Sequence, residues 1–323
     1  MENKVAFSRF KNIFEMRQKS ITALFGHHEG SINEKCFPHL IKRANHVMGF
    51  IGAGSRVLDF GCGFGLYSIL FGLHGNELYG IDSDAGRIDN FQRLIRHLEL
   101  DNVKAQTGDV LNLGYADGFF DACFANEILS HVRDLEQALS EISRVLKRGG
   151  TIYISDGNNS LSVPAGIKRR RLHKLLEDGN TDDAVFKTSA LTDTLSNTRK
   201  KIIKSQFGEL KDDAVALLAK KTKGMYDEQI IRACKQFIND GEIKERADFP
   251  FRNPIGGEKM EYPLNPFKLR AILTEKYGFE CRVLPQFISS PVLWKNALGK
   301  LIGMTHPVSL LISPFFEIVG IKG

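Results

Sequence analysis

The chain has few cysteines, and none of them lie close together in the sequence. The five cysteines are odd in number and form no C-x-x-C pair: Cys36, Cys62, Cys123, Cys234 and Cys281. This pattern argues against a disulfide framework and against a zinc site, and it is typical of a reducing compartment. We therefore expect a cytoplasmic protein.

Long apolar segments are also missing. The longest uncharged run, Leu301 to Phe316, has 16 residues and contains Pro307 and Pro314, so it is too short and too interrupted to span a bilayer. The first residues of the chain are polar and charged, without the apolar core of a signal sequence. With 42% hydrophobic and 25% charged residues among 323, the composition is typical of a globular α/β protein with additions, or of two smaller units.

The excess of positive charge is small, with a net charge of +6. Its sharpest cluster is Lys168 to Arg171, which could be a nucleic-acid patch, a region that attracts an anionic substrate, or a solvated helix face. Because no aromatic residues interleave with this cluster, we favour the solvated face and expect no nucleic-acid partner.

The most informative part of the chain is a short glycine-rich segment. Residues 57–60 are typical of a buried strand, and they lead into Gly61, Gly63 and Gly65. Glycine lets the backbone turn sharply and approach a ligand closely. A strand that ends in such a turn and continues into a helix, here 66–73, presents free N–H groups to a polar ligand. The segment therefore predicts a site for a nucleotide-type cofactor.

The spacing of the glycines indicates which cofactor binds. A dinucleotide fingerprint would need its third small residue at Leu66, whereas here the third glycine comes one residue earlier and Asp59 stands just before the loop. Residues 57–65 closely resemble the first motif of class I methyltransferases that depend on S-adenosylmethionine (SAM). The resemblance implies that Asp59 helps to hold the amino group of SAM. It also implies that the methionine end of SAM is wrapped by Gly61, Cys62 and Gly63.

An acidic residue closes the next predicted strand. Residues 77–82 alternate and end in Asp82, which lies 21 residues after Gly61. A carboxylate at this place can accept hydrogen bonds from both ribose hydroxyls. The alternative is a plain helix cap, but Asp84 can provide that cap for a helix starting at residue 85. We predict that Asp82 and the adjacent Ser83 contact the cofactor.

Two further segments follow the order of the same family. Residues 102–110 are typical of a strand that ends in Gly-Asp-Val, and the resemblance implies that Asp109, with Val110, meets the adenine amino group. A simple turn is the alternative. Residues 120–126 form an apolar stretch that ends in Asn126 and is similar to the family's fourth strand, so Asn126 is also a predicted cofactor contact.

A helix and a further strand complete the core. Residues 134–146 are typical of a helix, followed by a Lys-Arg-Gly-Gly turn at 147–150 and a strand at 151–155. Asn265, Pro266 and Gly278 have the spacing of an N-cap, a first helical residue and a helix stop.

The resemblance covers residues 55–157 well and implies the fold and the domain organisation. We expect an α/β, Rossmann-like, seven-stranded and mostly parallel sheet whose last strand is antiparallel. The expected parts are an N-terminal helical segment at 1–52, the SAM-binding core at 53–158, a helical cap insertion at 159–262, and the C-terminal part of the core at 263–323.

The implied reaction displaces a methyl group from a sulfonium. The protein must then exclude water, align the nucleophile and, for a hydroxyl acceptor, remove a proton. His131 is the best candidate for the base because it follows Asn126 by five residues, although it could be a structural or surface histidine. Weaker candidates are Glu127, Asp156, His27 and His28.

Several acceptors can be set aside from motifs that are missing. The chain has Ala125–Ile128 where amino-directed nucleic-acid enzymes carry Asn-Pro-Pro-Tyr or Asp-Pro-Pro-Tyr, and it has no Pro-Cys pair and no convincing metal-binding acid cluster. We therefore expect metal-independent transfer to a small molecule or sugar, at oxygen on family frequency, with S-adenosylhomocysteine as product. A methyltransferase acting on a lipid or polymer, with residues 291–315 at a membrane, and a non-catalytic SAM-binding protein remain alternatives.

Overall fold

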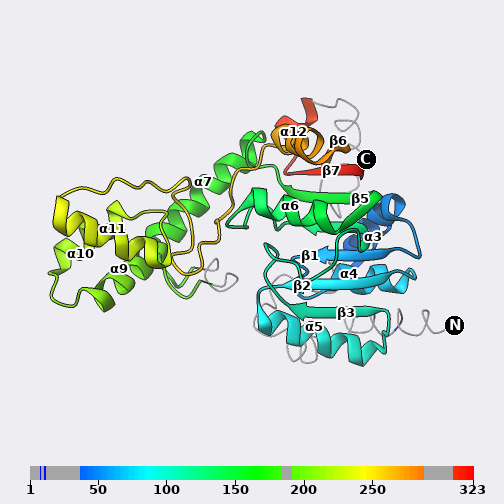
Figure 1. The fold of residues 1–323 in the computed structure, drawn as a ribbon, viewed down its shortest axis with the longest axis horizontal. Coiled ribbons are helices and arrows are strands. Elements are labelled where there is room, and N and C mark those ends of the chain that lie inside the picture. The colour runs from blue at the N-terminus through cyan, green and yellow to red at the C-terminus, as the bar shows by residue number, and fades with distance from the viewer. Residues whose placement is uncertain (1–7, 9–10, 12–36, 184–190, 287–307) are drawn as a thin grey trace. The chain divides into compact units, whose positions relative to one another are not determined.

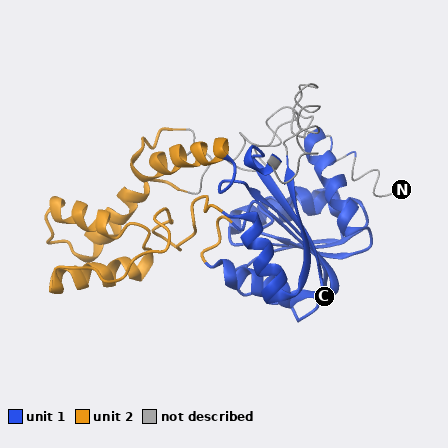
Figure 2. Ribbon diagram, turned by 90° about the horizontal axis from the view of Figure 1, so that it is seen from above, with its two compact units in different colours: residues 1–129, 134–162, 264–323 blue, residues 130–133, 163–263 orange. Residues whose placement is uncertain are grey.

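The computed structural model describes residues 8, 11, 37–183, 191–286 and 308–323 (Figure 1). The chain forms two compact units, which Figure 2 shows in different colours. The first, the core unit, contains the described residues up to Leu129, Asp134–Ser162 and Leu264 onward. The second, the helical unit, contains Ser130–Arg133 and Val163–Pro263.

A single seven-stranded sheet organises the core unit, in the order β3-β2-β1-β4-β5-β7-β6 (Figure 1). Strands β1 to β5 pair in parallel, whereas β7 lies antiparallel between β5 and β6. The predicted Rossmann-like sheet with an antiparallel last strand is thereby confirmed. The strands are β1 Arg56–Phe60, β2 Glu77–Asp82, β3 Val103–Thr107, β4 Phe120–Asn126, β5 Leu146–Gly157, β6 Phe279–Gln286 and β7 Phe315–Lys322.

Helices pack on both faces of the sheet because the central strands are buried on both sides. On one face, α3, α4 and α5 pack against side chains of β1 to β5. The hydrophobic cluster that they form includes the fully buried Phe71 of α4, Phe91 of α5 and Tyr153 of β5. The helices α6 and α12 contact each other and the strands β5, β6 and β7. The bounds are α3 Phe37–Ile51, α4 Leu66–Leu73, α5 Ala85–Leu98, α6 Leu135–Val145 and α12 Pro266–Tyr277.

The ends of these helices follow local capping rules. Asp134 begins α6 by accepting a hydrogen bond from Gln137 N, at 3.0 Å. Asn265 begins α12 in the same way, Pro266 is its first residue, and Gly278 ends it with a φ of +71°. The predicted punctuation of α12 is confirmed.

Strand β5 starts earlier than the sequence predicts. Leu146 already pairs with Phe120 of β4, and the register then shifts before Ala122 pairs with Thr151. Residues 147–150 are therefore an irregularity inside the strand, and Gly149 takes its φ of +76° there rather than at a helix stop. Burial of Leu146 against β4 outweighs the local turn signal.

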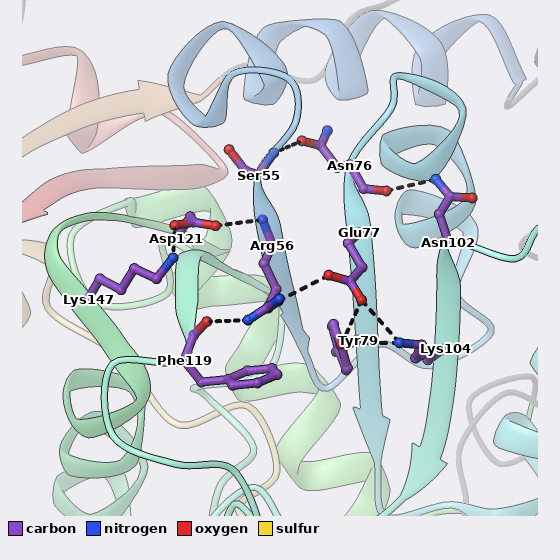
Figure 3. A network of polar contacts seen from close by, with 10 residues as sticks. All are labelled: Ser55, Arg56, Asn76, Glu77, Tyr79, Asn102, Lys104, Phe119, Asp121 and Lys147. Carbon is purple, nitrogen blue, oxygen red and sulfur yellow. Dashed lines mark hydrogen bonds and ion pairs between the residues drawn. The ribbon is translucent and has the colours of Figure 1, made fainter.

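A polar network fixes the amino ends of the strands (Figure 3). Glu77 accepts hydrogen bonds from Arg56, Tyr79 and Lys104, at 3.1, 2.7 and 3.0 Å. These bonds lower the pKa of Glu77 to about 2, and the bond from Tyr79 contributes most to the decrease. Asp121 accepts the backbone N–H of Arg56 at 2.8 Å. This edge is occupied by the protein's own ion pairs, so the carboxyl ends of the strands are the edge left for ligands.

The helical unit has a small core of its own. Its helices are α7 Val163–Asp178, α9 Leu195–Gln206, α10 Asp212–Lys221 and α11 Asp227–Asp240, and α9, α10 and α11 bury Ile203, Leu218 and Ile230 together. Arg199 of α9 is fully buried, donates to Ala219 O at 2.8 Å and forms an ion pair with Glu177 of α7. In the part of the chain that the structure describes, no helix is long and apolar enough to cross a membrane. Most of the segment 291–315, predicted as a possible membrane contact, lies outside the described residues.

Candidate cofactor and active site

The loop after β1 is held open by three left-handed glycines. Gly61, Gly63 and Gly65 have φ values of +76°, +54° and +71°. The N–H groups of Gly61 and Cys62 both donate to Ile81 O of β2, at 2.9 and 3.0 Å, which ties the loop to the neighbouring strand. Gly65 is the N-cap of α4, so the helix begins directly behind the loop.

The three glycines differ in what surrounds them. A Cβ on Gly61 would lie 2.5 Å from the side chain of Ile128, and one on Gly65 would lie 2.2 Å from the ring of Phe91. A Cβ on Gly63 would meet nothing within 4 Å. The loop is therefore packed against the protein at both ends and open at Gly63, where a ligand can approach the backbone.

The side chain of Cys62 faces the protein rather than this opening. A Cβ on Gly80 of β2 would lie 2.9 Å from Cys62 Sγ. Burial raises the pKa of the thiol well above its usual value, so it stays protonated and unreactive. Cys62 can serve a cofactor only through its backbone.

Asp82 lies at the end of β2, beside the loop. It is 6% exposed, and its carboxylate accepts Gly63 N at 2.9 Å and Asp84 N at 3.0 Å. Asp84 caps α5 by accepting Arg87 N at 3.0 Å, so the cap is not made by Asp82. Each carboxylate oxygen of Asp82 has a further lone pair with which it can accept a hydroxyl. The adjacent Ser83 is exposed.

Asp59 lies beneath the loop, in β1. It is 3% exposed and accepts the hydroxyl of Ser68, on α4, at 2.6 Å. Burial raises its pKa to about 7, and the negative charge of Asp82 contributes to the increase. A cation bound nearby would favour the ionised form of Asp59 and would lower that pKa.

The remaining predicted cofactor residues lie at the same edge of the sheet. Gly108 N donates to Asp82 O at 3.0 Å, which joins the ends of β2 and β3. The next residue, Asp109, is exposed and accepts Leu111 N at 2.9 Å, and Val110 is half-buried. Asn126 ends β4. The structure thus brings the glycine loop, Asp82, Asp109 and Asn126 to the carboxyl ends of four adjacent parallel strands.

His131 lies in the helical unit, in the short segment 130–133. Its carbonyl accepts Lys259 N at 3.0 Å, and its Nδ1 lies 3.0 Å from Lys259 O. A carbonyl can only accept, so Nδ1 carries the proton and Nε2 is the acceptor of the neutral ring. Nε2 faces Glu261 Oε1 at 3.8 Å. The sequence gives no signal for Lys259 or Glu261, since they lie about 130 residues along the chain from His131.

Two of the weaker base candidates are described as well. Glu127 follows Asn126 directly, is exposed, and has a φ of +53°. This left-handed conformation is uncommon for a residue with a side chain and is often found at functional sites. Asp156 is buried and accepts Gly157 N at 2.8 Å. His27 and His28 lie outside the described residues.

One polar residue at this edge carries no signal in the sequence. Arg43 of α3 donates to Asn126 Oδ1, 83 residues away along the chain.

A metal site would need several ligand side chains close together. Among the described residues, no three His, Cys, Asp or Glu side chains are grouped so that they could hold a metal ion.

Known proteins resemble the core unit in sequence. Residues 58–154 match the family described as "Methyltransferase domain". O-methyltransferase resE of Aspergillus sclerotiorum is 32% identical over 127 residues, which cover 39% of this chain and 48% of that protein. A ubiquinone biosynthesis O-methyltransferase of Coxiella burnetii is 31% identical over 135 residues, which cover 41% of this chain and 57% of that protein. The chain thus spans about half the length of these curated relatives.

Solved structures overlap with the chain in part. A SAM dependent methyltransferase from Aquifex aeolicus is 21% identical and covers 46% of this chain and 73% of its own, with a TM-score of 0.35. The sequence match is the informative one, because residues 58–154 begin in β1 and end in β5. They therefore contain the open glycine loop, Asp82, Asp109 and Asn126, at the carboxyl ends of β1 to β4. Residues 58–154 of this chain are a methyltransferase domain of the class I SAM-dependent type.

Proposed function

We propose that this protein transfers a methyl group from SAM to an oxygen of a small-molecule or sugar acceptor, without a metal ion. The observation that carries the proposal is the opening at Gly63, directly beside the carboxylate of Asp82. The O-methyltransferases among its relatives support oxygen as the acceptor atom. A role in modifying natural products or glycans fits this chemistry.

The residues at the carboxyl edge fit SAM. Gly63 leaves space for the methionine end, and the buried Asp59 provides a carboxyl group whose ionisation an ammonium would favour. Asp82 has lone pairs for the ribose hydroxyls, with Ser83 beside it, and Asp109 and Val110 would meet the adenine. Cys62 and Asn126 complete the predicted set of contacts.

For methyl transfer from SAM, the protein mainly has to position the reactants. SAM supplies a methyl group that its sulfonium already activates. The protein must align the acceptor oxygen and remove the proton of a hydroxyl. We assign proton removal to His131, because Lys259 O fixes its Nδ1 proton and leaves Nε2 to accept. The carboxylate of Glu261, on the Nε2 side, would stabilise the imidazolium that results.

Binding and turnover of SAM test the main proposal. Calorimetry should show binding of SAM, and methyl-labelled SAM should label phenolic or sugar hydroxyls in an acceptor panel, with equal rates in EDTA. A chain that does not bind SAM would refute the proposal. Binding with no transfer to any acceptor, including lipid vesicles, would favour a non-catalytic SAM-binding protein. Loss of activity in EDTA would refute metal independence.

The base assignment has a matched control. His131→Gln should lower kcat by about 100-fold while the Kd for SAM stays unchanged, because the base acts only in the chemical step. His74 also places its Nδ1 on a backbone carbonyl, Leu70 O at 2.7 Å, and it lies after α4 in the core unit. His74→Gln should leave kcat unchanged. A normal kcat for His131→Gln would remove the assignment.

A further inference from the structure

The sharpest basic cluster of the sequence, Lys168 to Arg171, lies on helix α7. Lys168, Arg170 and Arg171 are exposed, which is typical of a solvated helix face, whereas Arg169 is half-buried. The whole cluster belongs to the helical unit (Figure 2). Solvation of a helix face therefore does not explain Arg169.

The guanidinium of Arg169 has unused hydrogen-bond donors. Its Nε is buried and has no hydrogen-bond partner, and no described residue bonds to its Nη groups or forms an ion pair with it. Burial lowers the pKa of Arg169, but a guanidinium stays protonated at physiological pH. A half-buried charge with unpaired donors is unfavourable by itself, and a bound anion would stabilise it.

His173 shows what this face of α7 packs against. It lies four residues after Arg169, so the two side chains lie on the same face of the helix. His173 is buried, and its Nε2 donates to Met260 O at 2.6 Å, since a carbonyl can only accept. Its ring stacks on that of Phe251, with 4.1 Å between the centroids. Arg169 therefore lies on the face of α7 that contacts the segment 259–262.

The same segment carries the partners of the proposed base. Lys259 O accepts the Nδ1 proton of His131 at 3.0 Å. Glu261 has a φ of +53°, a left-handed conformation often found at functional sites, and its carboxylate lies 3.8 Å from His131 Nε2. The negative charge of Glu261 also acts on Arg169. Arg169 and His131 thus lie near the same carboxylate.

Positive charge exceeds negative charge around Arg169. Besides burial, the charge of Arg170 lowers the pKa of Arg169, and the charges of Arg169 and Lys223 lower that of His173. Among the described residues, Glu261 is the one acid that opposes both effects. Three cationic groups and one carboxylate favour an anion as the ligand of this surface.

We propose that Arg169 binds a carboxylate or phosphate group of the acceptor, near His131. A guanidinium offers parallel N–H donors that match two oxygens of such a group. An anion held there would orient the rest of the acceptor, so that one of its hydroxyls can meet His131 Nε2. This inference rests on the proposed function, because it takes His131 as the base.

Small anions test the inference on the full chain with S-adenosylhomocysteine. Benzoate and inorganic phosphate are titrated against protein that contains 15N-labelled arginine, with neutral benzyl alcohol for comparison. The Nε–H signal that is missing from Arg169→Gln belongs to Arg169. At least one of the two anions should shift this signal saturably, and benzyl alcohol should not. Calorimetry then measures the affinity of the tighter-binding anion for each variant.

Arg171 provides the matched control. It is exposed, carries the same charge on the same helix, and lies two residues after Arg169, so it lies on a different face. Arg169→Gln should weaken binding of the anion by about tenfold or more. Arg169→Lys should weaken it less, because an ammonium keeps the charge but not the paired donors. Arg171→Gln should bind the anion as the wild type does.

Glu261→Gln tests the same site with a change of opposite sign. Removing the negative charge near Arg169 should tighten binding of the anion by about two- to fivefold. If Arg169→Gln fails to fold, Glu261→Gln decides, and unchanged or weaker binding in that variant would overturn the inference.

Other results would overturn the inference as well. They are the absence of binding of both anions, equal binding of benzyl alcohol, an unchanged affinity in Arg169→Gln, and an equal loss of affinity in Arg171→Gln. A protein that transfers methyl groups but gives one of these results would keep the proposed function and lose the anion site. A protein that binds the anion through Arg169 but does not bind SAM would refute the proposed function and leave the anion site standing.

Discussion

Replacing Gly63 by alanine should separate cofactor binding from folding. The φ of Gly63 is +54°, a conformation that costs a residue with a side chain about 1–2 kcal/mol. The added Cβ meets no protein atom within 4 Å, so no steric clash adds to this cost. We therefore expect Gly63→Ala to fold, with a free energy of unfolding lower by about 1–2 kcal/mol.

The same methyl group should interfere with SAM. It would stand in the opening beside Asp82, where the loop backbone has to approach the ligand. Displacing the ligand from Gly63 should weaken SAM binding by about tenfold or more, which corresponds to about 1.4 kcal/mol.

Gly75 provides the matched control. Its φ is +88°, a Cβ there would also meet nothing within 4 Å, and it lies in the turn between α4 and β2, at the other end of the sheet. Gly75→Ala should lose similar stability and bind SAM normally. Gly61→Ala should be less stable than either, because its Cβ would lie 2.5 Å from Ile128.

Urea unfolding and calorimetric titration with SAM measure both quantities on each variant. The reasoning is wrong if Gly63→Ala binds SAM as tightly as the wild type. It is equally wrong if Gly75→Ala loses as much affinity, since strain alone would then explain the effect.

Two further predictions concern buried charges. Burial raises the pKa of Asp59 to about 7, so the folded protein keeps a proton that the unfolded chain releases near pH 4, and stability falls as pH rises between these values. Asp59→Asn should remove this dependence of stability on pH, raise the free energy of unfolding at pH 8 by up to about 4 kcal/mol and weaken SAM binding. Urea unfolding at pH 5 and pH 8 measures the effect, and an equal loss of stability between the two pH values in both proteins would contradict the prediction. Arg199→Met leaves the buried Glu177 with Lys223, at 3.8 Å, as its one remaining ion-pair partner among the described residues, and should lower stability by about 3–5 kcal/mol. The double variant Arg199→Met with Glu177→Leu should recover most of the lost free energy of unfolding in the same assay. If the double variant is as unstable as the single one, the unpaired charge of Glu177 is not the cause of the loss.

Much of the core fold can be predicted from local patterns. The buried strand at 57–60 and the glycines after it are neighbours in the sequence, and the caps of α12 at Asn265 and Gly278 depend on adjacent residues. The start of β5 could not be predicted in this way. A Lys-Arg-Gly-Gly sequence is typical of a helix stop, but the pairing of Leu146 with Phe120 is a tertiary contact and it determines where the strand begins.

The grouping of the residues proposed for the cofactor was predictable for the same physical reason. Gly63, Asp82 and Asp109 each follow a strand, and parallel neighbouring strands bring their carboxyl ends together, so position in the chain indicates position in space. His131 shows where this reasoning stops. It follows β4 closely, but Lys259 pairs with its backbone and the residue folds with the helical unit.

Two of the predicted site residues, Asn126 and His131, contact side chains from distant parts of the chain, and this has a physical cause. Arg43 meets Asn126 across 83 residues, and Glu261 meets His131 across a still longer separation. Such contacts depend on how helices and loops pack, and they leave no periodic or spacing signal in the sequence. The residues proposed for the cofactor lie on adjacent strands of a fold that many functions share, whereas what distinguishes one function from another depends on side chains particular to each chain. The family match over residues 58–154 therefore supports the proposed reaction without naming the acceptor, and variants of Glu261 test whether the proposed base at His131 depends on a residue outside that match.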